Sequence, residues 1–139
     1  MDNDNRVEVG DTAAEQGDAS EFQGQIVVLA LKQEDECQAF AELFADMKLE
    51  VKHAATAKEA LNLLEDNSVS LLVIDIQLSD IHAWQMIGKI REIERSRDVP
   101  VIIITDQPTL GTTVAGVDYL MRPVSIARLR HNVIATLTV

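Results

Sequence analysis

Short apolar runs alternate with amphipathic segments along most of this chain, and this alternation restricts the possible fold more than any other feature. The runs QIVVLAL (25–31), SLLVID (70–75) and VIIIT (101–105) are continuous and rich in β-branched residues. Such runs are typical of strands that are covered on both faces. Two weaker strands are predicted at 50–54 and 117–121. The pattern predicts an α/β fold with a doubly wound, five-stranded parallel sheet and helices on both faces.

The segments between the strands carry the spacing of helices. Apolar residues at i, i+3, i+4 and i+7 predict a first helix over 40–47, which acids precede where they suit a helix dipole. Thr56, with Glu59 three residues later, has the spacing of a capping box. A third helix is expected from Trp84 to about Arg97, and a last helix closes the chain. The stretch 106–116 contains Pro and Gly and has little room for a helix.

The charge of the chain is unevenly distributed. The net charge is −11, and residues 1–24 hold seven acids against a single base, Arg6. This stretch has no apolar periodicity, so we interpret 1–24 as a disordered acidic leader and 25–139 as one folded domain. Because an acidic surface repels phosphate backbones, direct binding to nucleic acid is not expected.

The number of cysteines and the lengths of the apolar runs indicate the cellular compartment that we expect for the protein. The chain has one cysteine, Cys37, so it cannot form an internal disulfide. Its longest apolar run is far shorter than the ~20 residues that a membrane span needs. We therefore expect no membrane association and a cytoplasmic location.

Three polar residues stand where predicted strands end. In a parallel sheet of this kind the functional site lies at the carboxyl ends of the strands. Asp75 closes the third strand, Thr105 closes the fourth, and Arg122 follows the fifth. These residues are the candidates for a site. His82, in a loop close to Asp80, has no partners at metal-ligand spacing and is interpreted as a solvated histidine.

Three segments together resemble the receiver domain of bacterial two-component response regulators. They are LLVIDIQLSDIHAW, IIIT followed by Asp106, and GVDYLMRP, which is similar to the family's GADDYLTKP. The resemblance covers 25–139 and implies a flavodoxin-like receiver fold with strand order 2-1-3-4-5. It also implies that Asp75 is the phosphoacceptor for a kinase histidine, and that Thr105 and Tyr119 are the switch residues. The implied partners are a histidine kinase, another signalling protein or an output domain.

The chain departs from this family where metal and phosphate would be held. The family's acidic pair, which holds Mg²⁺, is replaced by Ala30 and Leu31, and its lysine after the fifth strand by Arg122. Phosphoryl transfer depends on charge neutralisation, and Mg²⁺ is typically held by carboxylates. We therefore expect no cofactor, or Mg²⁺ bound weakly at best. A rescue of the site by Glu34 and Asp35 is the less favoured alternative.

Other departures concern the loops. The family's Pro and Gly after the phosphoacceptor become Ser79 and Ala83 here. The stretch 106–116 is shorter than the family's, so the helix between the last two strands is expected to be shortened or missing. If Arg122 reaches Asp75, its permanent charge neutralises the pocket without metal or phosphate and holds one conformation.

Three functions remain in competition. The favoured one is an atypical, pseudo-receiver-like signalling module that acts mainly through protein–protein interaction, not as an enzyme. The second is a functional response regulator phosphorylated on Asp75. The third is a small enzyme on the same fold, but the sequence contains no nucleotide-binding or nucleophile motif that would support it. The predicted interaction face binds a partner or a second copy of the chain, and it contains Tyr119, Ile126, Leu129, Arg128 and Arg130.

Overall fold

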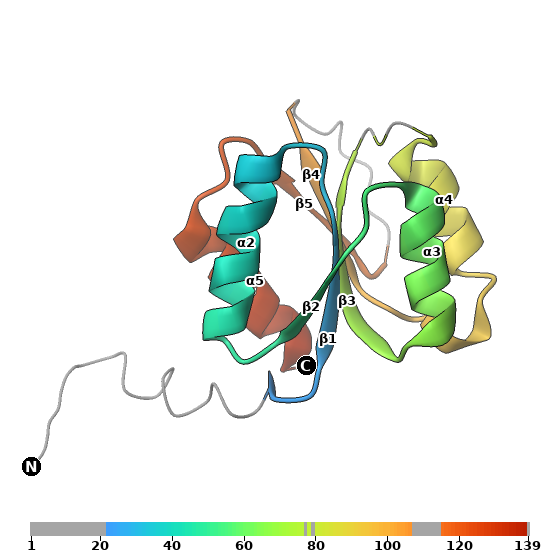
Figure 1. Cartoon of the computed structure of the whole chain (residues 1–139), viewed down its shortest axis with the longest axis horizontal. Coiled ribbons are helices and arrows are strands. Elements are labelled where there is room, and N and C mark those ends of the chain that lie inside the picture. Colours follow the sequence, from blue (N-terminus) through green and yellow to red (C-terminus); the bar gives the residue numbers. More distant parts are fainter. Residues whose placement is uncertain (1–21, 77, 79, 107–114, 139) are drawn as a thin grey trace, which may run out of the picture.

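The computed structural model describes residues 22–76, 78, 80–106 and 115–138, and in them strands and helices alternate as predicted (Figure 1). The strands form one five-stranded sheet in the order β2-β1-β3-β4-β5, and all neighbouring pairs are parallel. The elements are β1 (Ile26–Ala30), α2 (Glu34–Asp46), β2 (Glu50–His53), α3 (Ala57–Asp66), β3 (Val69–Asp75), α4 (Ala83–Ile90), β4 (Val101–Thr105), β5 (Val117–Met121) and α5 (Ile126–Leu137). The doubly wound parallel sheet is therefore confirmed.

Helices cover both faces of the sheet. In Figure 1, α2 and α5 lie on one side of the strands, and α3 and α4 lie on the other. Successive side chains of a strand point to opposite faces, so β3 sends Leu71 and Val73 toward α2 and α5. It sends Leu72 and Ile74 into the cluster formed with α3 and α4. This double burial explains why β1, β3 and β4 read as continuous apolar runs instead of alternating ones.

The third predicted helix ends earlier than expected. Its apolar spacing predicted a helix to about Arg97, but α4 ends at Ile90 and a 3₁₀ turn follows at Glu94–Ser96. The buried hydroxyl of Ser96 donates to the Ile90 carbonyl at 3.1 Å. The Arg91 guanidinium donates to the carbonyls of Arg97, at 3.2 Å, and Val99, at 2.7 Å. Ser96 thus satisfies a carbonyl that a longer helix would have bonded internally, and Arg91 ties the segment after the 3₁₀ turn to the end of α4.

The start of the folded region also differs from the prediction. The acidic leader was expected to extend to residue 24, but Phe22 is buried in the core beneath α2 and α5. The amide of Gln25 donates to the Phe22 carbonyl at 3.0 Å, which closes a turn into β1. The packed domain thus includes Phe22, because burial of this aromatic ring outweighs the polar composition around it. Residues 1–21 lie outside the described residues.

The connection between β4 and β5 agrees with the predicted loss of a helix. The described part of the chain contains four α-helices, and none of them lies between these strands. Residues 107–114 lie outside the described residues. In the part that is described, no helix is long and apolar enough to cross a membrane.

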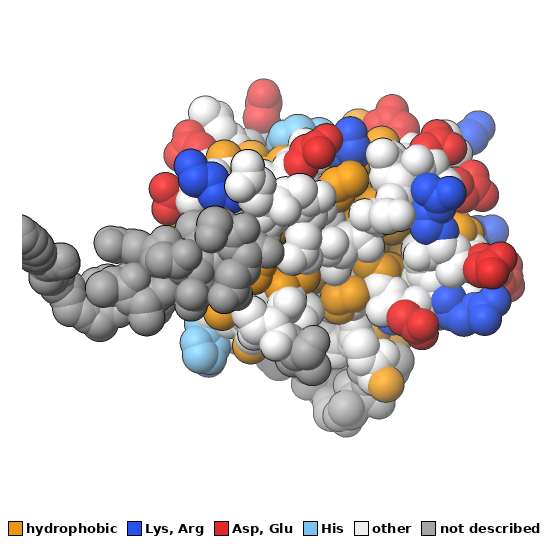
Figure 2. Space-filling model, turned by 90° about the horizontal axis from the view of Figure 1, so that it is seen from below, with side chains coloured by type: hydrophobic (Ala, Val, Ile, Leu, Met, Phe, Trp, Pro, Cys, Tyr) orange, Lys and Arg blue, Asp and Glu red, His pale blue; other side chains and the backbone are white. Residues whose placement is uncertain are grey.

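Charges of both signs surround the end of the molecule where the strands begin. Figure 2 shows this end, with Lys and Arg side chains next to Asp and Glu side chains along the side of α3 and α4. Such mixing provides no extended field of one sign on the face in view.

Two side chains cap the beginning of α3. The Thr56 hydroxyl accepts from the Glu59 amide at 3.1 Å, so the predicted N-cap is confirmed. The carboxylate of Asp80, in the loop after β3, accepts from the amides of Ala57 at 2.9 Å and Lys58 at 3.1 Å. The pKa of Asp80 is lowered, chiefly by the hydrogen bond from the Ala57 amide. Asp80 therefore joins the loop that follows Asp75 to the neighbouring helix.

We expect Asp80→Asn to lower the melting temperature at neutral pH, because it removes the negative charge from a helix N-terminus. A carboxyl group with a lowered folded-state pKa stabilises the fold above its unfolded pKa and loses that contribution as pH falls through the folded value. The difference between wild type and variant should therefore shrink in acid. Thermal melts between about pH 7 and pH 2 measure it.

Asp66→Asn is the matched control, since Asp66 is exposed at the other end of α3. It should lack this acid-dependent convergence. A constant difference between wild type and Asp80→Asn at all pH values would contradict the assignment of Asp80 as a charged cap.

Candidate functional site

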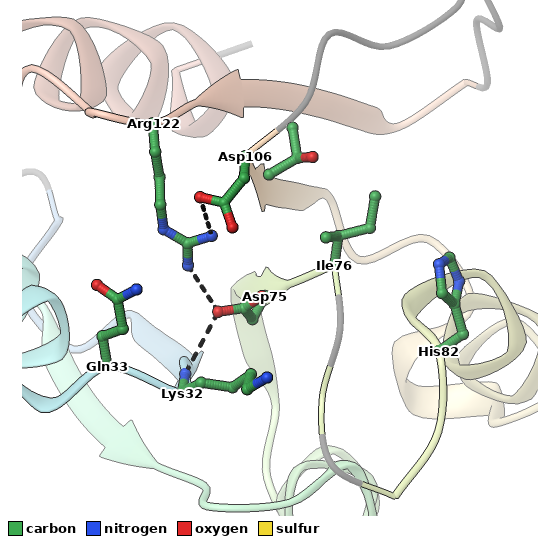
Figure 3. Close-up of a pocket in the computed structure, with 8 residues that line it drawn as sticks. Lys32, Gln33, Asp75, Ile76, His82, Asp106 and Arg122 are labelled. Carbon is green, nitrogen blue, oxygen red and sulfur yellow. Dashed lines mark hydrogen bonds and ion pairs between the residues drawn. The ribbon is translucent and has the colours of Figure 1, made fainter.

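The residues that end β3, β4 and β5 meet at one edge of the sheet (Figure 3). Asp75 and Thr105 are the last residues of β3 and β4, and both are buried. The backbone amide of Arg122 donates to the Thr105 carbonyl at 2.8 Å, which fixes Arg122 just beyond β5. The sheet itself thus brings together three of the residues that the sequence singled out.

The guanidinium of Arg122 is the centre of this site. Its Nη2 atom donates to Asp75 Oδ2 at 2.6 Å, and its Nη1 atom donates to Asp106 Oδ1 at 3.2 Å. The Nε and Nη2 atoms donate to the two carboxylate oxygens of Glu36, at 2.9 and 2.8 Å. One arginine therefore pairs with three carboxylates from three different segments of the chain.

This arrangement is largely shielded from water. The side chain of Arg122 is 12% exposed and that of Glu36 is 13% exposed, whereas Asp106 lies at the open side. The pKa of Arg122 is raised, first by the hydrogen bond to Glu36 and then by that to Asp75, against the opposing effect of burial. The guanidinium is therefore a permanent positive charge inside the pocket.

The end of β1 supplies no acid to this pocket. Ala30 and Leu31 are buried in the apolar core, Ala30 toward α3 and Leu31 toward α2. The adjacent backbone amide of Lys32 approaches Asp75 Oδ2 at 3.4 Å. Within the described residues, no three His, Cys, Asp or Glu side chains are grouped so that they could hold a metal ion. Carboxylates that surround a guanidinium do not form a Mg²⁺ site, so the residues present do not fit this metal.

An open cavity of about 240 Å³ lies beside Asp75. Asp75, Thr105, Asp106 and Arg122 line it, and Lys32, Gln33, Ile76 and His82 complete its wall. In Figure 3, Arg122 and His82 lie on opposite sides of the Asp75 strand end. The cavity can admit a small solute, but the acid within it already has a positively charged partner.

The sequence matches the response regulator receiver domain over residues 27–134. The chain belongs to this family.

Relatives with several different names contain a similar segment. The probable cyclic di-GMP phosphodiesterase of Vibrio cholerae is 30% identical over 88 residues, and the response regulator Rre1 of Synechocystis is 32% identical over 79. The transcriptional regulatory protein BasR of Escherichia coli is 32% identical over 87. These matches cover 60%, 57% and 59% of this receiver domain chain, but only 20%, 33% and 38% of those proteins. The chain thus matches less than half of each of these relatives.

Solved receiver structures share the fold. The chemotaxis response regulator CheY4 of Vibrio cholerae superposes with a TM-score of 0.75 at 17% identity, over 81% of this chain and 98% of that one. The receiver domain of the sensor histidine kinase PA1611 from Pseudomonas aeruginosa superposes with a TM-score of 0.74 at 20% identity, over 84% of this chain and 99% of that one. That structure was solved with magnesium coordinated in its active site cleft. At these identities the likeness shows the fold alone.

Tyr119, the remaining residue that was predicted to be a switch, lies on the opposite face of β5 from α5. Tyr119 is half-buried and packs on Trp84 of α4, with the ring centroids 6.1 Å apart at an angle of 50°. Burial raises the pKa of its hydroxyl. Tyr119 therefore belongs to the layer of α3 and α4, and its role as a switch stays a prediction.

The predicted interaction face needs a correction. Leu129 was expected on the surface, but it is 0% exposed and packs in the core beneath α5. Leu129 and Val133, four residues apart, form the buried side of α5, whereas Ile126 at the first position of the helix stays 42% exposed. Arg130 lies partly buried and pairs with Asp46 of α2 at 3.6 Å. Arg128 is exposed.

Sequence reasoning missed two members of the site. Glu36 was read only as an acid suited to the first turn of a helix, and its pairing with Arg122 spans 86 positions. His82 is exposed, in agreement with its interpretation as solvated, but its role as the N-cap of α4 was not predicted; its Nδ1 atom accepts from the Trp84 amide at 3.2 Å. Its place before an amphipathic helix could have suggested the cap, whereas no local signal points to Glu36.

We expect Arg122→Met to lower the free energy of unfolding by about 2–4 kcal/mol, because Glu36 and Asp75 would then be shielded without a counter-ion. The value is below that of a fully buried pair, since Asp106 opens the site to solvent. Urea denaturation measures it. Adding Asp75→Asn should recover part of the loss, because it removes one of the stranded charges.

Arg128→Met is the control, because Arg128 is exposed on α5 and should change stability by less than about 0.5 kcal/mol. Equal effects of the two arginine substitutions would show that the Arg122 network is not stabilising.

Proposed function

We propose that this receiver domain is an atypical signalling module of a two-component system, which acts mainly through protein–protein interaction and with weak or no Mg²⁺-dependent phosphorylation. The observation that carries this proposal is the 2.6 Å contact between Arg122 Nη2 and Asp75 Oδ2. The residue in the phosphoacceptor position already has a permanent cation as its partner.

The chemistry of phosphoryl transfer explains the consequence. The reaction leaves a protein mainly the tasks of positioning the groups and neutralising charge, and metal ions usually do much of the latter. Here the side chains of Ala30 and Leu31 offer no oxygen ligands, and the guanidinium is bound to Oδ2 of the carboxylate that would have to attack phosphorus. Both effects oppose phosphorylation of Asp75. The carboxylate of Asp75 is instead held in an ion pair with Arg122.

Names of the relatives support a role in signalling rather than catalysis by this chain. They include a phosphodiesterase and transcriptional regulators, and all are matched over only part of their length. Different outputs attached to a similar receiver segment favour a module that communicates with other domains. We therefore propose a histidine kinase, another signalling protein or an output domain as partner, and a cytoplasmic location.

Phosphorylation on Asp75 remains the second candidate function. The observation that favours it is that Asp75 and Thr105 both line a cavity open to solvent, so that a phosphoryl donor can reach them. In this case Arg122 would serve as the counter-ion of the phosphoryl group.

Incubation of the protein with acetyl phosphate and Mg²⁺ separates the two functions. We expect little phosphoryl adduct by intact mass spectrometry, and little dependence of its amount on Mg²⁺, because the ligands for the metal are missing. The control is Asp75→Asn, which defines the background at other sites. Rapid, stoichiometric and Mg²⁺-dependent modification that disappears in this variant would establish the second function.

An apolar surface at the carboxyl end of β5 and the start of α5 is the corrected candidate for the interaction face. Met121 is 53% exposed and Ile126 is 42% exposed, and Arg128 adds a charge nearby. We expect Ile126→Lys with Arg128→Glu to weaken self-association or partner capture about tenfold or more, with an unchanged circular dichroism spectrum. Analytical ultracentrifugation measures self-association. A pull-down with a histidine kinase of the same system measures partner capture.

Lys58→Glu with Glu65→Lys on the opposite side of the sheet is the control, because it changes exposed charges of α3 only. Equal binding by the α5 variant, the α3 variant and the wild type would place the interaction surface elsewhere.

A further inference from the structure

Glu36 contributes more contacts to the Arg122 guanidinium than either aspartate does. Its two oxygens accept from Nε and Nη2 at 2.9 and 2.8 Å, which is a two-pronged pairing, while Asp75 and Asp106 each accept a single hydrogen bond. Paired hydrogen bonds between a guanidinium and a carboxylate fix orientation as well as distance. The same pair is the largest cause of the raised pKa of Arg122.

The position of Glu36 on a packed helix determines from which side its carboxylate binds the guanidinium. Glu36 lies in the first turn of α2, and its side chain is almost as shielded as that of Arg122. α2 is packed on the sheet through Phe40 and Phe44, so the carboxylate is held by a rigid element. The guanidinium is thereby fixed from α2 at one side and from the end of β5 at the other. Its Nη2 atom bridges Glu36 and Asp75.

The other groups around Arg122 could not set this position alone. Asp106 is mostly exposed and its contact is the longest of the three, so solvent competes with it. The contact of Asp75 with the guanidinium is through the single nitrogen Nη2, and a single hydrogen bond does not by itself fix the plane of the guanidinium. Without the charge of Glu36, Arg122 would have a second stable choice, which is to extend toward Asp106 and water.

We propose that Glu36 is the positioning residue that holds Arg122 against Asp75 and so determines how far the pocket resists phosphorylation. This inference rests on the proposed function, since it assigns to one residue the resistance described there. Glu36 acts in two ways. It keeps the guanidinium on Oδ2 of Asp75, and its negative charge repels an incoming phosphoryl donor.

The test compares Glu36→Gln with wild type in the full chain. The first readout is the rate at which the Arg122 Nε–H exchanges with solvent, seen by ¹⁵N NMR and assigned through its absence in Arg122→Lys. The second is the initial rate of Asp75-dependent phosphoryl adduct formation from acetyl phosphate. Loss of one charge-assisted pairing should speed Nε–H exchange and raise the adduct rate, each roughly tenfold.

Two further variants separate positioning from a general effect of charge or folding. Glu34→Gln removes an exposed acid from the same first turn of α2 and should leave both readouts unchanged. Glu36→Asp keeps the charge with a shorter reach and should fall between wild type and Glu36→Gln. Thermal melts of all variants verify folding.

The outcomes are distinct for the two proposals. Readouts in Glu36→Gln that equal those of Glu34→Gln would overturn the role of Glu36, even if wild type is phosphorylated slowly. Fast Mg²⁺-dependent phosphorylation of wild type would overturn the proposed function. If Glu36→Gln is then still faster than Glu34→Gln, the role of Glu36 as a positioning residue stands.

Discussion

The ion pair between Arg122 and Asp75 determines how the rest of the pocket is arranged. A carboxylate shielded from water requires a positive charge, and in this chain an arginine after β5 supplies it. Where the family has a metal-binding acidic pair at the end of β1, this chain has apolar Ala30 and Leu31, which extend the core. Glu36 and Asp106 accept from further donors of the guanidinium, so four of its five N–H groups donate to protein carboxylates.

The fold could be predicted almost entirely from the sequence because its signals are local. Runs such as VIIIT match β4 to the residue, since a strand buried on both faces must be apolar throughout. Errors occurred where a single side chain changes the outcome. Ser96 binds the carbonyl of Ile90 where α4 ends, and Arg91 binds carbonyls of the segment that follows the 3₁₀ turn. Phe22 draws the chain into the core within a stretch of polar residues.

The site was predictable only as far as strand ends determine it. Asp75, Thr105 and Arg122 follow apolar strands, and parallel topology places such residues together. Glu36 enters through the packing of α2 on the sheet, and nothing in its neighbours in sequence indicates that partner. The burial of Leu129 was missed for a different reason. Leu129, Val133 and Leu137 recur every four residues, which indicates a core-facing stripe, but the expected loss of a neighbouring helix was taken to leave this face uncovered.

The wide separation of the pocket residues along the sequence also affects how the domain folds. Glu36 and Arg122 are 86 positions apart, so their contact requires that both ends of the domain have reached their places. Pairings of such long range are formed at a high cost in chain entropy and slow the folding of parallel sheets. Until that contact forms, the positive charge of Arg122 does not lie between the acids Glu36 and Asp75. Pairing of β5 with β4 places Arg122 at the pocket, so formation of this edge of the sheet also delivers the cation that the two acids share.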